Sequence, residues 1–194
     1  MLKLKLVTDS SWVRNVVEKN IPEILTDHAW CEQKAASNAI SIVVRYPEHS
    51  ELVEEMIRLS QEELSHFQMV HEMIKKRGYV LGRERKDHYV NLLYAFMIKG
   101  GTPEENLVDR LLFAAMVEAR SCERFKVLSE HIDDQELASF YHELMVSEAN
   151  HYTLFIGFAR RFAQSVDVDK RWQEWLNYEG EIIQGFGNKE TIHG

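Results

Sequence analysis

Turn-forming and disulfide-forming residues are scarce in this sequence. Three prolines and nine glycines among 194 residues argue against the many tight turns of a β-sandwich or barrel and favour long helices. Two cysteines, Cys31 and Cys122, are too few for a disulfide scaffold and fit a reducing cytosol. The length is close to that of one typical domain, so we expect a single domain over residues 1–194.

Long apolar runs and an excess of positive charge are also missing. The stretch between Lys34 and Arg45, for example, holds only ten uncharged residues, short of the roughly 18 that a membrane span needs. Residues 1–8 alternate Leu with Lys and lack the apolar block of a secretory signal. We therefore expect a cytoplasmic protein without a membrane segment. The net charge of −8 does not suggest nucleic-acid binding by bulk electrostatics, so any such role needs a local patch.

What the sequence does contain is helical periodicity. Thr102 and Asp134 are candidate helix caps, and Gly78 is the expected stop of the helix that precedes it. A short amphipathic segment lies near 11–20, and we expect helices at about 22–45, 50–76, 89–98, 103–131, 135–163 and 169–183. Four long helices with short additional ones predict an all-α four-helix bundle.

Two of the long helices contain a Glu-x-x-His motif, Glu63 to His66 and Glu148 to His151. This spacing places a carboxylate and an imidazole on one helix face, and in both cases that face is apolar. A buried ionised glutamate must pair, become neutral or bind a metal, so buried Glu–His pairs of purely structural role stay an alternative. A third copy, Glu190 to His193, lies in a glycine-containing tail, and we interpret it as accidental.

The other two long helices each offer one inward carboxylate. Glu32 shares its face with small alanines, and Glu118 shares its face with apolar residues. Glu123 instead shares a face with Arg120 and Lys126, which predicts a solvated charge network. We therefore choose Glu118 over Glu123 as the ligand.

The spacing between these glutamates nearly repeats, with 31 residues from Glu32 to Glu63 and 30 from Glu118 to Glu148. Two similar helical hairpins would bring four carboxylates and two imidazoles together, as in di-iron carboxylate bundles. Such ligands suit iron or manganese. The predicted metal ligands are Glu32, Glu63, His66, Glu118, Glu148 and His151. The two cysteines are better explained as small buried hydrophobes, and His28 is either a hydrogen-bond partner of a ligand or a core histidine.

Four segments resemble the tRNA 2-methylthio-isopentenyl-adenosine hydroxylase family: 27–36, 62–67, 118–125 and 147–152. The stretch Glu118-Ala119-Arg120-Ser121-Cys122-Glu123-Arg124-Phe125 carries the most specific likeness. The resemblance implies a ferritin-like fold, a centre of two iron ions, and O₂-dependent hydroxylation of the prenyl group on the adenosine beside the tRNA anticodon. It also implies tRNA as the substrate.

Further expectations concern partners and rival functions. The chain has no Gly-x-Gly-x-x-Gly after a strand and no cysteine cluster, so a separate reductase is expected to supply electrons. Rival functions are a ferritin-like protein that oxidises or stores iron, a manganese catalase, and a metal-free interaction module. A monomer and a dimer both stay open.

Two sets of side chains could contact a substrate, although each is more often structural. The aromatic candidates for a pocket are Phe67, Phe125, Tyr152 and Phe155. The basic candidates for RNA are Lys75, Lys76, Arg77, Arg83, Arg85 and Lys86, with Arg160 and Arg161 as a second patch.

Overall fold

The structure, a computed structural model, describes residues 2–186 and residue 192. Within these residues the secondary structure is entirely helical, which agrees with the predicted all-α class. The elements are η1 (Val13–Val17), α1 (Ile21–Arg45), α2 (Ser50–Lys76), α3 (His88–Phe96), α4 (Pro103–His131), α5 (Gln135–Phe162) and α6 (Val168–Phe186). None of the described helices combines the length and the apolar character that crossing a membrane requires.

The helix ends follow local sequence signals. Thr102 begins α4 with a reciprocal capping box, in which its hydroxyl accepts from the Glu105 N–H and the Glu105 carboxylate accepts from the Thr102 N–H. Asp134 caps α5 by accepting from two backbone N–H groups. Beyond the end of α2, Gly78 adopts a φ of +73°, a left-handed conformation that glycine tolerates without strain. The expected helix boundaries therefore agree with the observed ones to within a few residues.

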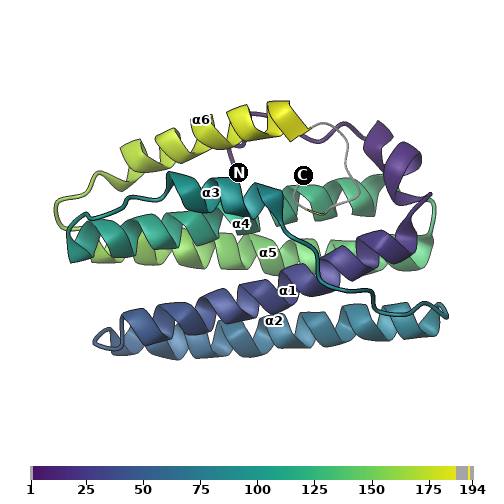
Figure 1. The fold of residues 1–194 in the computed structure, drawn as a ribbon, viewed down its shortest axis with the longest axis horizontal. Helices are drawn as coiled ribbons and strands as arrows, with labels where there is room; N and C mark the ends of the chain where they lie inside the picture. The colour runs from purple at the N-terminus through teal and green to yellow at the C-terminus, as the bar shows by residue number, and fades with distance from the viewer. Residues whose placement is uncertain (1, 187–191, 193–194) are drawn as a thin grey trace. The chain divides into compact units, whose positions relative to one another are not determined.

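The chain divides into two compact units, and one of them comprises residues 19–86 with residue 192. In this unit α1 and α2 pack along each other as a helical hairpin (Figure 1). Its core is formed by fully buried apolar side chains, among them Leu25, Ile42, Leu52, Met56 and Val70. Burial of side chains of this kind contributes about 1.5–3 kcal/mol each. The prediction of one domain over 1–194 stays a prediction.

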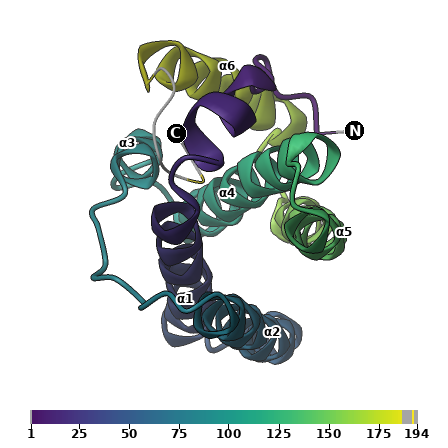
Figure 2. The same ribbon diagram turned by 90° about the vertical axis from the view of Figure 1, so that its right-hand side faces the viewer.

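The second unit comprises residues 2–18 and 87–186. Here α4 and α5 lie side by side, as both ribbon views show (Figures 1 and 2), and η1, α3 and α6 also contact α4. Asp109 of α4 ties α6 in place by accepting hydrogen bonds from Trp175 Nε1 and Arg171 Nε, each at 2.8 Å. The α4–α5 pair therefore has one face covered by further helices of its own unit.

Candidate metal centre

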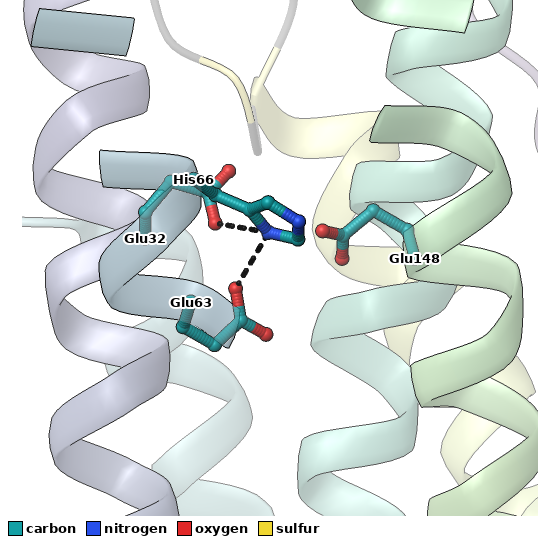
Figure 3. A group of neighbouring side chains, drawn as sticks. All are labelled: Glu32, Glu63, His66 and Glu148. Carbon is teal, nitrogen blue, oxygen red and sulfur yellow. Dashed lines mark hydrogen bonds and ion pairs between the residues drawn. The ribbon is translucent and has the colours of Figure 1, made fainter. Parts of the chain in front are cut away.

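The first group of predicted ligands, termed the first triad, consists of Glu32 on α1 with Glu63 and His66 on α2. Each residue offers one ligand atom, and these atoms lie within 4.8 Å of one another. His66 Nδ1 is 3.3 Å from Glu63 Oε2 and 3.6 Å from Glu32 Oε2, as the dashed lines in Figure 3 mark. All three side chains are buried. The α1–α2 hairpin therefore brings close together the three residues that the sequence predicted as ligands on these two helices.

Electrostatics in the first triad hold a positive charge on the imidazole. Burial alone would lower the pKa of His66, but hydrogen bonds to Glu32 and Glu63 outweigh it and raise this pKa to about 10. Burial would likewise raise the pKa of Glu32, but hydrogen bonds with His28 and His66 hold it well below its usual range. Without metal, a protonated His66 therefore balances the charge of the neighbouring carboxylates.

His28 is a hydrogen-bond partner of a predicted ligand rather than a histidine that only fills the core. Its Nε2 lies 2.7 Å from Glu32 Oε1, and its side chain is fully buried. The two residues are four apart on α1, so they lie on one face of the helix. A neighbour of this kind orients a ligating carboxylate before any ion binds.

The second triad consists of Glu118 on α4 with Glu148 and His151 on α5. Its ligand atoms also lie within 4.8 Å of one another. His151 Nδ1 is 3.9 Å from Glu118 Oε2 and 4.0 Å from Glu148 Oε1, and its Nε2 is 3.5 Å from the Ser147 hydroxyl. The α4–α5 hairpin thus brings together the three residues predicted from it.

The chemistry of each donor set fits a hard divalent ion. Two carboxylates and one imidazole per triad are the ligands expected for iron or manganese. Ligand atoms on one octahedral ion stand about 3–4 Å apart, and the distances within each triad fall in or near this range. By donor type and spacing, each triad is therefore suited to hold a metal ion.

The surroundings of Glu123 differ from those that the sequence predicted. The prediction that it belongs to a solvated network with Arg120 and Lys126 is wrong, because Arg120 is 0% and Glu123 only 8% exposed. Glu123 accepts from the N–H and hydroxyl of Thr8 and from Arg120 Nη1, at 2.7–2.8 Å. Arg120 also donates to Glu179 of α6. Glu123 is therefore engaged in a buried structural network, and the choice of Glu118 as the ligand stays a prediction.

The other candidates divide between core and surface. Phe125 and Phe155 are each 1% exposed and belong to the core, whereas Phe67 and Tyr152 are half-buried. Cys122 is buried, and burial raises its pKa to about 11, as expected of a small hydrophobe. Residues 190 and 193 of the third Glu-x-x-His copy lie outside the described residues.

The basic candidates are exposed or half-buried. In the second patch Arg160 forms an ion pair with Asp169 at 2.7 Å, and Arg161 stacks over Phe158. Both arginines therefore interact with residues of their own unit. In the first patch Arg83, Arg85 and Lys86 are exposed, and Arg85 pairs with Glu23. The sequence offered no signal that Trp30 contacts this patch, yet its Nε1 donates to the Gly82 carbonyl at 3.0 Å.

The sequence is similar to a known protein family and to two named proteins. Residues 2–194 match the family described as tRNA-(MS[2]IO[6]A)-hydroxylase (MiaE). A Pseudomonas putida protein named tRNA 2-(methylsulfanyl)-N(6)-isopentenyladenosine(37) hydroxylase is 36% identical, over 96% of this chain and 89% of its own length. A Salmonella typhimurium protein of the same name is 26% identical, over 91% and 82% respectively.

A solved structure extends the likeness to three dimensions. Protein 43 with aldehyde deformylating oxygenase activity from Synechococcus matches with a TM-score of 0.90 and 31% identity, covering 98% of this chain and 95% of that one. This likeness confirms the predicted all-α, ferritin-like fold.

Proposed function

The chain belongs to the tRNA-(MS[2]IO[6]A)-hydroxylase (MiaE) family, and from that premise we propose that it hydroxylates the isopentenyl group of 2-methylthio-isopentenyl-adenosine beside the anticodon of tRNA. The reaction takes O₂ as co-substrate and uses a centre of two iron ions. The predicted family and the prediction of an enzyme are confirmed by the match. The observation that carries the proposal is the pair of buried Glu, Glu, His triads.

We assign the two ions to the six triad residues. Four glutamates and two neutral histidines carry four negative charges, which two divalent ions balance. A neutral site can be buried, whereas the two ionised carboxylates of a triad repel each other when no metal is bound. The residues that would hold the ions are Glu32, Glu63, His66, Glu118, Glu148 and His151.

When bound, the irons supply the activation of O₂ that insertion into a C–H bond requires. The chain's own contribution is to place the ligands and exclude water. His28 orients Glu32 by the 2.7 Å hydrogen bond, and burial of both histidines, 6% exposed for His66 and 3% for His151, keeps their surroundings dry. A dry site strengthens charge interactions and protects reactive species from water.

The source of electrons lies outside this chain. Hydroxylation sends one oxygen atom of O₂ into the C–H bond and the other into water, which consumes two electrons and two protons. The sequence holds no dinucleotide-binding fingerprint and no cysteine cluster for iron–sulfur. We therefore propose a separate reductase as partner, with the cytoplasm, where tRNA is available, as the place of action.

Reconstitution tests the function directly. The protein is loaded with ferrous iron, supplied with a chemical reductant and ¹⁸O₂, and given tRNA that carries the prenylated base. Mass spectrometry of the digested nucleosides should show a hydroxylated product with one ¹⁸O, and His151→Ala should abolish it. Absence of product from protein holding two irons per chain would refute the proposal.

The same preparation separates the rival functions. Iron storage requires a hollow shell, so a monomer or dimer on a sizing column argues against it. Evolution of O₂ from peroxide by manganese-loaded protein, without nucleoside modification, would support a catalase instead. Loss of the hydroxylated base from tRNA of cells that lack this protein would link the activity to the cell.

A further inference from the structure

The segment after α2, residues 77–87 and here called the basic strap, is fastened to α1 although it has no helix of its own. The Gly82 carbonyl accepts from Trp30 Nε1 at 3.0 Å, and the Gly82 N–H donates to Thr26 Oγ1 at 3.3 Å. Lys34 Nζ donates to the Arg85 carbonyl at 3.0 Å. A Cβ on Gly82 would meet Thr26 Cγ2 at 3.0 Å, so a larger residue here would require the Thr26 side chain to shift slightly, whereas glycine fits without a shift.

Two cationic side chains of the strap, Arg83 and Lys86, stay exposed while its backbone is bound to α1. Of the two acids in the strap, Glu84 is paired with Lys34 at 3.1 Å, and Asp87 accepts a hydrogen bond from the Val90 N–H at the start of α3. Arg83 and Lys86 are exposed and make no ion pair with any described residue. In a chain of net charge −8 this concentration of positive charge is local, and phosphate groups are the partners that such a group of cations attracts.

An aromatic ladder adjoins the strap and the first triad. Trp30 and Phe67 have ring centroids 5.9 Å apart, and Phe67 stacks on His71 at 6.4 Å with planes 16° apart. All three rings are half-buried. Phe67 directly follows His66 in sequence, and Trp30 is the residue that holds Gly82. Aromatic faces beside cations are the combination on which unpaired bases of RNA stack.

We propose that the basic strap and the ladder of Trp30, Phe67 and His71 form the seat for the anticodon loop of the RNA. Arg83 and Lys86 hold backbone phosphates, and the ladder stacks the base that leaves the RNA stack next to the first triad. This proposal rests on the proposed function, because only chemistry at a buried metal requires the base to be turned out.

The test uses the metal-loaded protein and an anticodon stem–loop RNA with 2-aminopurine directly 3′ of the anticodon. Stacking quenches the fluorescence of this base. We expect the complex with Phe67→Leu to fluoresce severalfold more strongly than the wild-type complex at similar affinity, because the base leaves the RNA without a ring to stack on. Phe67→Tyr, which keeps the aromatic face, should restore the quenching, and Tyr94→Leu, at a half-exposed aromatic on α3, should leave it unchanged.

The strap is tested with Arg83→Glu combined with Lys86→Glu. Affinity should fall by about tenfold or more at low salt, and the slope of log affinity against log salt should flatten by about one to two. Lys126→Glu, which replaces an exposed cation of α4, is the matched control and should have little effect.

Two outcomes overturn this seat: quenching in Phe67→Leu equal to wild type, or affinity of the strap variant equal to that of Lys126→Glu. If the wild-type protein still hydroxylates tRNA in either case, the function stands and only the seat is refuted. If the wild-type protein binds and quenches as expected but forms no hydroxylated nucleoside, the seat stands and the proposed function fails.

Discussion

Glu118 and Glu123 lie five residues apart on α4, and replacing each by glutamine separates a metal ligand from a structural carboxylate. Glu123 accepts three hydrogen bonds, two from Thr8 and one from Arg120, at 2.7–2.8 Å. An amide in its place turns an NH₂ group toward these donors and removes the charge that Arg120 faces. Charge-assisted hydrogen bonds contribute about 1.5–3 kcal/mol each, so Glu123→Gln should lower the free energy of unfolding by about 2–4 kcal/mol.

Glu118→Gln should lower the metal content but leave the stability of the metal-free chain nearly unchanged. Glu118 is near the His151 imidazole and makes no contact shorter than 3.9 Å to it, and the metal-free second triad holds two carboxylates close together. Removing one charge relieves repulsion, so the free energy of unfolding without metal should change by less than about 1 kcal/mol. The metal content should fall, because an amide is a weak ligand for a hard ion.

Two measurements on each variant check this reasoning. Urea unfolding in the presence of a chelator, followed by circular dichroism, reports the stability of the metal-free chain. Elemental analysis after iron loading and desalting reports the ions per chain. Loss of metal from Glu123→Gln with retention in Glu118→Gln would refute the assignment on α4, whatever the two stabilities are.

Three further changes test other parts of the structure. In the metal-free chain the pKa of His66 is raised to about 10, so its imidazole must lose a proton before it can bind a metal ion. The metal affinity, measured by chelator competition, should therefore rise with pH by up to about tenfold per unit below pH 10. A pH-independent affinity would contradict this. The same raised pKa stabilises the metal-free fold below about pH 6.5, and this contribution is lost as the pH rises through about 10. Thr102→Ala removes the hydroxyl that accepts from Glu105 N and should cost about 1 kcal/mol in urea unfolding, with no change in metal content. His28→Ala should weaken binding of one ion by about 10–100-fold through Glu32, and equal weakening of both ions would contradict that role.

The helix ends, and the grouping of the candidate ligands within each hairpin, were predictable because their causes are local. The cap at Thr102 is decided within three residues, and a Glu-x-x-His motif defines a face within one turn of helix. The choice of Glu118 over Glu123 as a ligand stays a prediction; it depends on the apolar neighbours of Glu118, which are on its own helix. Periodicity reports the face on which a residue lies, and this was sufficient for all six predicted ligands to group as expected within their hairpins.

The surroundings of Glu123 were not predictable in this way. Its face carries Arg120 and would be solvent-exposed on an isolated α4, but Thr8 and Glu179 cover it from positions 115 and 56 residues distant in sequence. Contacts of such separation leave no trace in local periodicity. The fastening of Gly82 to Trp30, 52 residues apart, was invisible for the same reason, although the charges of the strap were plain in the sequence.

The two triads share a ligand set but differ in what supports them. Glu32 has His28 four residues earlier on α1, with a 2.7 Å hydrogen bond, whereas the position four residues before Glu118 on α4 is Ala114, which cannot donate from its side chain. His66 stands 3.3–3.6 Å from its two carboxylates and His151 stands 3.9–4.0 Å from its own. We therefore expect the first triad to need less rearrangement around an ion than the second. Because ordering side chains costs free energy that preorganisation has already supplied, the first triad should fill first, and the near-repeat in the sequence produces two chemically similar but energetically unequal positions.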